Sequence, residues 1–246
     1  MPQQVIPFST DFIGATDPDL FPNPFDTVTE TSGNLVTYVA TGGRASTPGM
    51  RVDMAGTSAD SYGTVNQGWT VDPAGKVLRA AVDVNFGIIP FAGISGSAIT
   101  LIRLTSPGSG VLMNVQLFKP ATGTARFRVN TVETVVNQAG STNIAASTWY
   151  NVAGEIDNTD PGNAKVRIYV DNVLEGETTG VATFTRVVGR VLIGGITGSG
   201  VPVAGVNWNI DNAACIVSRG AIGPPQSAPM YSRLGNTQFG IPGVMF

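Results

Sequence analysis

The chain has no histidine, a single cysteine and few charged side chains, which make up 13% of its 246 residues. Without histidine it lacks the usual general base of hydrolases, a common ligand of zinc and iron, and the side chain that titrates between pH 5 and 8. Ser-His-Asp and Cys-His catalysis are therefore excluded. Cys215 has no disulfide partner within the chain and lies in an apolar run over 213–217, so we expect a small core residue rather than a reactive thiol.

Charge and hydropathy argue against two further classes of partner. The net charge is −3 at pH 7 and the basic residues are scattered singly, whereas nucleic-acid-binding proteins usually cluster them. No apolar stretch approaches the ~20 residues that a membrane-spanning helix needs. The opening residues, Met1 to Gln4, lack the basic start and apolar core of a signal peptide. We therefore expect a protein made in the cytoplasm that contacts neither nucleic acid nor membrane.

What the chain does contain favours an all-β fold. Its 31 glycines and 16 prolines suit many turns, and no amphipathic helical run is found. Short runs of alternating or apolar residues between turn residues predict roughly a dozen strands at the spacing typical of a two-sheet sandwich. The predicted strands are 35–40, 50–54, 62–66, 76–86, 98–104, 111–118, 125–130, 132–136, 149–157, 165–172, 190–195 and 206–217.

The segments 149–157 and 165–172 are predicted as two central strands, which we call the hub, and the second of them runs into a tight turn at Asp171 and Asn172. The turn sequence Asp-Pro-Gly-Asn at 160–163 joins them. In the second strand Val166, Ile168 and Val170 share one face, and the polar residues between them share the other. This period of two predicts a half-buried antiparallel hairpin.

Several motifs in the hub and the last strands carry a family resemblance. They are Trp-Tyr-Asn-Val and Glu-Ile-Asp-Asn within 149–158, Val-Arg-Ile-Tyr-Val-Asp-Asn at 166–172, Val-Leu-Ile-Gly-Gly at 191–195 and Trp-Asn-Ile-Asp-Asn-Ala at 208–213. On these motifs the chain resembles the concanavalin A-like lectin and glucanase superfamily, particularly its laminin-G-like members. The resemblance implies a two-sheet antiparallel jelly-roll sandwich, often with carbohydrate bound on the concave face or in the edge loops. Many members, including some built into phage particles, are structural.

The segment from Glu155 to Asp160 resembles the catalytic strand of the superfamily's glucanases, in which two glutamates flank an aspartate. A retaining glycosidase needs two carboxyl groups about 5–5.5 Å apart, one of them kept protonated. A period of two places Glu155 and Asp157 on one face, but the third position is Asp160, which opens a turn. We therefore favour a charged strand end followed by a turn, predict no catalytic residue, and expect the protein not to be an enzyme.

Three residues are candidates for contact with a carbohydrate: Trp69, Asp157 and Asn209. Trp69 is the tryptophan best placed to stack on a sugar, because Trp149 and Trp208 lie within apolar strands and are expected in the core. Acidic and amide residues at several strand ends leave calcium as an open alternative. No calcium-loop spacing occurs, however, and we predict no metal site and no cofactor.

The last segment, 219–246, differs in composition from the rest. Its prolines and glycines argue against strand and helix, yet it is too apolar for a solvated tail. We predict a jelly-roll domain over 1–218 and an extended C-terminal arm over 219–246 that docks on its own sandwich or on a neighbouring subunit. The arm residues expected to make this contact are Met230, Tyr231, Leu234, Phe239, Ile241 and Phe246.

These observations favour a non-catalytic structural or surface protein of a phage particle, such as a capsid decoration, spike or tail-associated subunit. Such a protein would form homo-oligomers and contact other virion proteins through its terminal arms, after synthesis in the host cytoplasm. The first alternative is a carbohydrate-binding module that recognises surface glycans. The second, less favoured, is a glucanase-type glycoside hydrolase.

Overall fold

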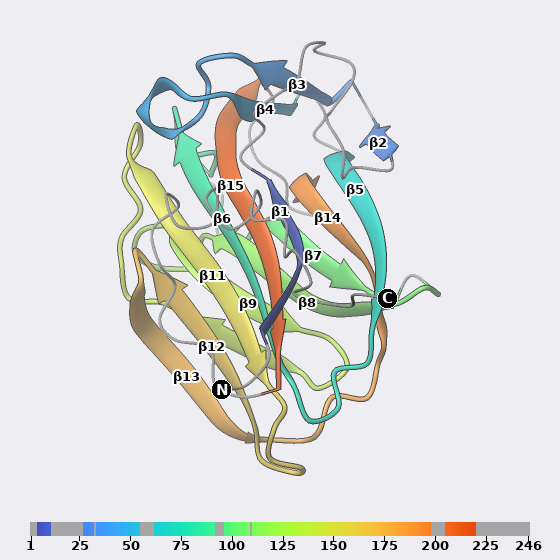
Figure 1. The fold of residues 1–246 in the computed structure, drawn as a ribbon. Coiled ribbons are helices and arrows are strands. Elements are labelled where there is room, and N and C mark those ends of the chain that lie inside the picture. Colours follow the sequence, from blue (N-terminus) through green and yellow to red (C-terminus); the bar gives the residue numbers. More distant parts are fainter. Residues whose placement is uncertain are drawn as a thin grey trace, which may run out of the picture.

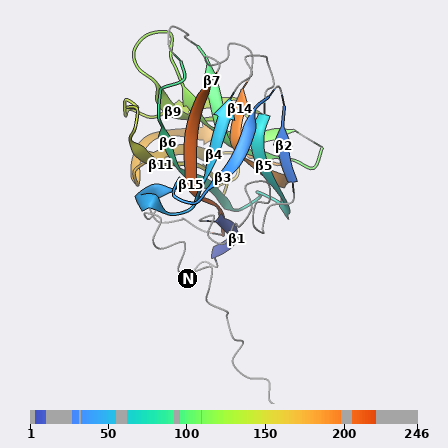
Figure 2. The same cartoon turned by 90° about the horizontal axis from the view of Figure 1, so that it is seen from above.

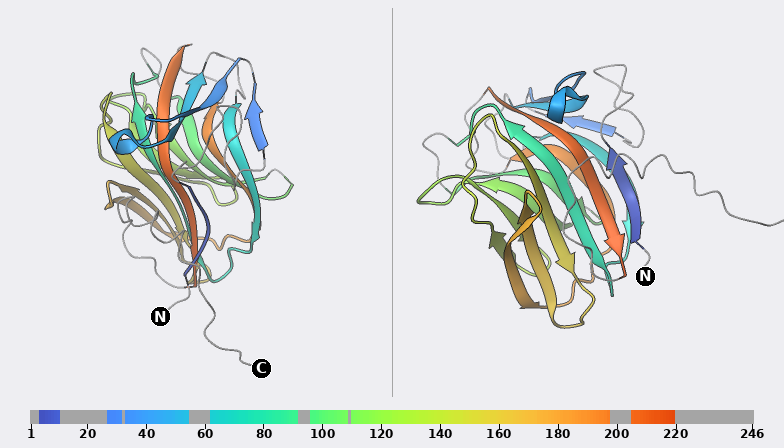
Figure 3. Two further views of the ribbon diagram at one scale, coloured as in Figure 1. Left: turned by 45° about the horizontal axis from the view of Figure 1, so that its top comes forward. Right: turned by 60° about the vertical axis from the view of Figure 1, so that its left-hand side comes forward.

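The computed structural model describes residues 4–10, 27–31, 33–54, 62–91, 96–108, 110–197 and 205–219. These residues form two antiparallel sheets packed face to face (Figures 1 and 3). This confirms the predicted all-β sandwich. The described residues contain one helix, the three-residue 3-10 turn η1 (Arg44–Ser46), and none that could cross a membrane.

The larger sheet has eight strands, and its last strand in the sequence, β15, lies near its middle. β4 pairs with the first half of β15 and β1 with the second half, and Figure 2 shows β15, β4 and β3 side by side. In spatial order the strands are β13 (Val173–Val181), β12 (Ala164–Val170), β11 (Trp149–Asp157), β6 (Val77–Phe86), β15 (Val206–Ser218), β4 (Gly49–Met54) and β3 (Leu35–Val39), with β1 (Gln4–Thr10) beside β15.

The smaller sheet has seven strands and covers one face of the larger one. Its middle strands come from the centre of the chain, and β14 and β5 extend it on one side. In spatial order the strands are β10 (Val136–Ala139), β9 (Arg126–Thr131), β8 (Val111–Phe118), β7 (Ala98–Thr105), β14 (Val188–Thr197), β5 (Tyr62–Val71) and β2 (Thr27–Glu30).

The core lies between the sheets and is made by alternate residues of the strands. In β6 the inward side chains are apolar, as the predicted period of two requires. Gly154 of β11 lies at a close approach of the two sheets, because a Cβ placed there would be 2.7 Å from Val115 Cγ2 and 2.8 Å from Val129 Cγ2. The absence of a side chain at Gly154 therefore permits the two sheets to pack at this point.

No predicted strand covers β1 or β2, and two further strands differ from the prediction. The predicted strand 132–136 is mostly a turn, in which the Thr131 hydroxyl donates to the Thr134 carbonyl and accepts the Val136 N–H. Strand β10 begins only at Val136. The second error is β13, which was not predicted because its residues are largely exposed and include Gly176 and Gly180. It forms because Asp171 and Asn172, at φ values of 47° and 70°, turn the chain back onto β12.

The predicted core residues have mixed outcomes. Cys215 is buried, and burial raises the pKa of its thiol, which confirms an inert core residue. Trp208 is buried against Phe86, with ring centroids 5.8 Å apart. Trp149 is wrong as a core residue: it is half-buried, because it has the opposite parity in β11 to the inward residue Tyr150. The predicted arm lies outside the described residues beyond Arg219.

Candidate functional site

The outward side of the seven-stranded sheet carries a row of polar side chains across four strands. The strand register aligns Arg103 of β7, Asn114 of β8, Asn130 of β9 and Asn137 of β10. Arg103 Nε donates to Asn114 Oδ1 (2.8 Å), Asn114 Nδ2 to Asn130 Oδ1 (3.0 Å), and Asn130 Nδ2 to Asn137 Oδ1 (2.9 Å). With strands ~4.8 Å apart, the row extends about 14 Å.

A second row runs beside the first, two residues further along the strands. Gln116 Nε2 donates to the Thr100 hydroxyl (2.9 Å), and Arg128 Nε donates to Gln116 Oε1 (2.7 Å). The Arg128 guanidinium also lies over the Phe118 ring, 4.0 Å from its centroid. These contacts fix the guanidinium on the sheet surface. We name the two rows with their neighbours the arginine–amide face: Thr100, Arg103, Asn114, Gln116, Phe118, Arg126, Arg128, Asn130 and Asn137.

The arginine–amide face has positive charge without local compensation. The strands of this sheet contain only one acidic residue, Glu30 of the edge strand β2, which accepts the Val36 N–H. Within the described part of the chain no carboxylate pairs with Arg103, Arg126 or Arg128.

Two of these arginines lack an interaction that a half-buried cation needs. Arg126 Nε is buried without a hydrogen-bond partner among the described residues. Burial lowers the pKa of Arg128, although an arginine stays protonated at neutral pH. A half-buried cation with no counter-ion has lost hydration without gaining an ion pair. An anionic ligand would supply what both residues lack.

The structure does not bring the three predicted carbohydrate contacts together. Trp69 belongs to β5 of the seven-stranded sheet, and its side chain lies outside the described side chains. Asp157 and Asn209 are in the eight-stranded sheet, where Asp157 aligns with Val77 of β6 and Asn209 with Asn85. Eight residues along β6 separate these positions by about 27 Å. A carbohydrate contact by any one of the three stays a prediction.

Glu155, the other candidate in the hub, is part of a buried ion-pair network. The register aligns Arg79, Glu155, Arg167 and Glu177 across four strands, with alternating charge. Glu155 Oε2 accepts from Arg79 Nε (2.9 Å), and its Oε1 accepts from Arg167 Nη1 (2.6 Å). The Arg79 guanidinium lies over the Tyr169 ring, 4.7 Å from its centroid. Both carboxylate oxygens of Glu155 are thus occupied by arginines, which is the arrangement of a structural ion pair.

The remaining residues of the glucanase-like segment serve the strand end and its turn. Asp157 accepts from the Thr159 hydroxyl (2.6 Å) and from Arg167 (3.2 Å). Asp160 is exposed and accepts from Asn163 in the predicted turn. No group of three or more acidic, cysteine or histidine residues in the described part of the chain is placed to hold a metal ion. Calcium stays an open alternative.

Comparison with known proteins relates the chain to others by its fold. No family model matches the chain, and no curated protein matches its sequence significantly. Among solved structures it is similar to an endo-β-1,4-glucuronan lyase from the fungus Trichoderma reesei, with a TM-score of 0.64 and 14% identity over 86% of this chain and 95% of that one. It is also similar to an alginate lyase from Aplysia kurodai, with a TM-score of 0.55 and 10% identity over 86% and 98% of the two chains.

A third similar structure is the binding domain of Paraclostridial Mosquitocidal Protein 1. The TM-score is 0.54 and the identity 9%, over 85% of this chain and 48% of that one. The class that the fold defines is thus the jelly-roll β-sandwich found in polysaccharide lyases and in a toxin's binding domain. At these identities the likeness shows the fold alone.

The comparisons overturn one prediction from the sequence. The expectation that the protein is not an enzyme rested on the absence of histidine and of a catalytic motif. It is contradicted, because the similar structures include a glucuronan lyase and an alginate lyase. The absence of histidine excludes histidine chemistry and does not exclude catalysis as such.

The arginine–amide face was not predicted from the sequence. Its signal was present in the alternation of Arg126, Arg128 and Asn130, and of Asn114 with Gln116. Each strand alone reads as a half-polar strand. Only the register shows that the polar halves lie on one surface, because neighbours across strands are far apart in the sequence.

Proposed function

We propose that the protein binds an anionic polysaccharide on the arginine–amide face. One observation carries the proposal: Arg103, Arg126 and Arg128 share one sheet surface on which the described residues offer them no carboxylate. Uronate-containing polymers present carboxylates and hydroxyls along an extended chain. Arginine donors suit the carboxylates, and the amides of Asn130 and Asn137 can donate to or accept from hydroxyls.

Three features support this proposal. Arg103 and Arg128 have fixed partners on the sheet, so little entropy of these side chains is lost when a ligand binds. The row of Arg103 and three amides, about 14 Å long, extends across strands, as a chain-like ligand requires. Two solved structures with this fold are lyases whose names give glucuronan and alginate, both polyuronates, as their substrates.

The test is a titration of the full chain with polyglucuronate and with a neutral β-glucan, by isothermal calorimetry. We expect binding of the polyuronate that weakens as salt is added, and little or none of the neutral polymer. The substitution Arg128→Gln should weaken binding roughly tenfold or more, since a charge-assisted hydrogen bond contributes about 1.5–3 kcal/mol. The control is Arg51→Gln, which removes an arginine ion-paired with Asp53 on the other sheet.

Three outcomes would contradict the proposal. The first is no binding to any polyuronate, and the second is equal binding of the neutral polymer. The third is an equal effect of the Arg128 and Arg51 substitutions. A circular dichroism spectrum of each variant establishes that it is folded before the affinities are compared.

A second candidate function is cleavage of the same polymer by a lyase reaction. It is favoured by the arginines, because neutralising a uronate carboxylate makes the neighbouring C–H proton easier to remove, and by the shared fold. In such a β-elimination a base removes the C5 proton, the C4–O4 bond breaks as the C4–C5 double bond forms, and the departing O4 takes up a proton. The test is the ultraviolet absorbance of unsaturated uronate ends during incubation with polyglucuronate or alginate. Its absence with both polymers would leave binding without cleavage.

A place in a phage particle stays a prediction from the sequence resemblance. The arm residues from Met230 to Phe246 that would contact other subunits lie outside the described residues. Light scattering of the full chain and of a chain truncated after Arg219 would test it. The prediction requires an oligomer that becomes a folded monomer when the arm is removed.

A further inference from the structure

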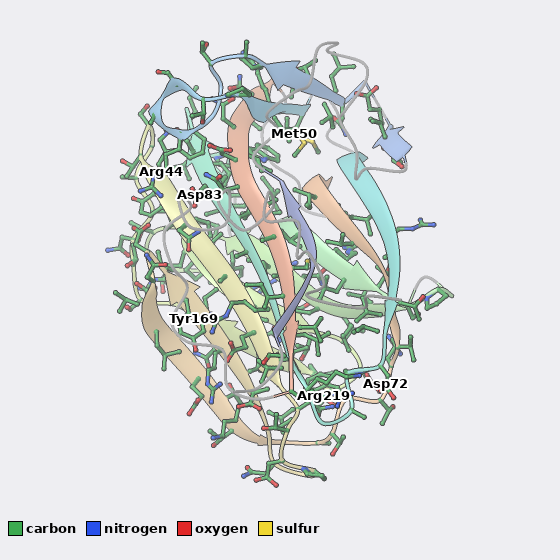
Figure 4. All side chains as sticks on the ribbon, viewed as in Figure 1. Arg44, Met50, Asp72, Asp83, Tyr169 and Arg219 are labelled. Atoms are coloured by element: carbon green, nitrogen blue, oxygen red, sulfur yellow. The ribbon has the colours of Figure 1, made fainter. Side chains whose placement is uncertain are left out.

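Two buried carboxylates lie opposite each other on the eight-stranded sheet, away from the arginine–amide face. Asp83 of β6 and Asp211 of β15 are paired in register and are 0% and 1% exposed. Among the described residues one cation is close to them, Arg44, whose Nη1 is 3.5 Å from Asp83 Oδ2 (Figure 4). Two carboxylates with one guanidinium leave a buried negative charge, which is energetically costly.

The carboxylate pair holds the segment 43–47 against the sheet. Asp211 Oδ2 accepts the N–H of Arg44 (2.8 Å) and lies 3.1 Å from the hydroxyl of Thr47, whose shorter contact is the Arg44 carbonyl (2.6 Å). Between these two contacts, Ala45 and Ser46 have φ values of 58° and 62°. Non-glycine residues adopt this left-handed conformation only when surrounding contacts impose it. The conformation of loop 43–47 therefore depends on Asp211.

The other groups that hydrogen-bond the pair directly are uncharged amides. Further charges nearby are Asp171, which accepts the Asn151 N–H (2.9 Å), and the ion pair of Arg51 with Asp53 on the neighbouring strand β4. Asp83 accepts from Asn151 Nδ2 (2.7 Å) and Asn212 Nδ2 (3.0 Å), and Asp211 Oδ1 accepts the Asn212 N–H (2.8 Å). The carbonyl oxygen Asn151 Oδ1 is buried with no donor among the described residues. The cluster thus has more acceptors than donors, and one added proton would correct both the charge and the donor count.

We propose that the carboxylate pair takes up one proton from solvent as the pH falls from 7 to 5. This proton stabilises the conformation in which loop 43–47 is docked on the sheet. Protonation reduces the charge of the pair from −2 to −1, which Arg44 balances. The proton belongs to the pair rather than to one oxygen. The device is independent of the proposed polysaccharide site.

The direction of the pH effect follows from linkage. Burial raises the pKa of Asp83, and burial together with the Asp83 charge raises that of Asp211 from 3.8 to about 6. A carboxyl whose pKa is raised when the loop is docked stabilises the docked conformation. This stabilisation is complete below pH 3.8 and is lost as the pH rises through about 6. For an opening that exposes Asp211, these values predict an opening equilibrium about tenfold smaller at pH 5 than at pH 7.

Hydrogen exchange of the Arg44 amide in the full chain tests how the docking of loop 43–47 depends on pH. After correction for intrinsic exchange rates, its protection should increase about tenfold between pH 7 and 5. The control is the Phe184 amide, which donates to the neutral side chain of Asn158 (3.0 Å) and should not follow this change. Asp211→Asn should abolish the pH dependence at Arg44, and Asp83→Asn should move it to lower pH.

A carboxyl carbon titration by NMR keeps the test informative if a variant fails to fold. The unmodified chain should show an aspartate carboxyl that titrates near pH 6. The proposal is overturned if every aspartate titrates near its ordinary value. It is equally overturned if protection of the Arg44 amide is constant, or falls, between pH 7 and 5.

Discussion

Glu155 should be a major determinant of stability, although its sequence context suggests catalysis. The perturbation is Glu155→Ala, which removes the carboxylate that Arg79 and Arg167 share. Arg79 and Glu155 have side-chain exposures of 0% and 1%, whereas Arg167 is 16% exposed. Arg167 keeps Asp157 and Glu177 as partners. The cost therefore falls on Arg79, which would retain its charge in the interior after losing a carboxylate.

The expected loss is about 3–5 kcal/mol in the free energy of unfolding, the range found when one partner of a buried ion pair is removed. The assay is urea unfolding of the full chain, followed by tryptophan fluorescence. The matched control is Glu177→Ala at the far end of the same row. Glu177 has a side-chain exposure of 32%, so this loss should be about 1 kcal/mol or less.

Two results would refute this reasoning. A loss below about 1 kcal/mol for Glu155→Ala would mean that the Arg79 charge is accommodated without its carboxylate. Equal losses for the two variants would mean that burial does not determine how much each ion pair of the row contributes to stability. Activity on a polysaccharide that vanished in a fully stable Glu155→Ala variant would instead restore a catalytic role for this residue.

Two further predictions concern packing, and both are measured by the same urea unfolding. Gly154→Ala should lower the free energy of unfolding by about 1–3 kcal/mol, because its Cβ would overlap Val115 and Val129 between the sheets. The control is Gly108→Ala, where nothing lies within 4 Å of the added Cβ, and it should change this free energy by about 0.5 kcal/mol or less. Trp208→Ala should cost about 3–5 kcal/mol. Trp208→Phe should cost clearly less, because Trp208 Nε1 has no hydrogen-bond partner among the described residues and so none is lost. Equal losses for the two glycine variants, or for the two tryptophan variants, would contradict the packing described here.

Local pattern was sufficient for much of the fold. The alternation in 76–86 and 165–172 predicted β6 and β12, and the turn sequence at 160–163 predicted the hairpin connection between β11 and β12. These features are encoded by neighbours in the chain, because the side-chain period of a strand is a property of the strand itself. The same local reasoning failed for β13, whose exposed, glycine-containing sequence becomes a strand by pairing with β12.

The grouping of polar side chains on the sheets depended on information that the sequence does not display. Trp69, Asp157 and Asn209 were chosen singly for their chemistry, and the fold places them apart. Arg103, Asn130 and Gln116 each read as an ordinary polar strand residue, and only the register of β7 to β10 joins them into one face. The same holds for Asp83 and Asp211, which lie 128 positions apart in the sequence.

By itself, the sequence determined the fold class, a β-sandwich. It also determined that the chain has no histidine and no disulfide within it, and it predicted no membrane-spanning helix, in agreement with the described residues. It did so because composition and period are local properties that need no partner strand. Tertiary structure decided which polar side chains became neighbours, which arginines were left without carboxylates, and which carboxylates were forced together in the interior. Those outcomes depend on strand order and register, which arise from packing between segments that are distant in the chain.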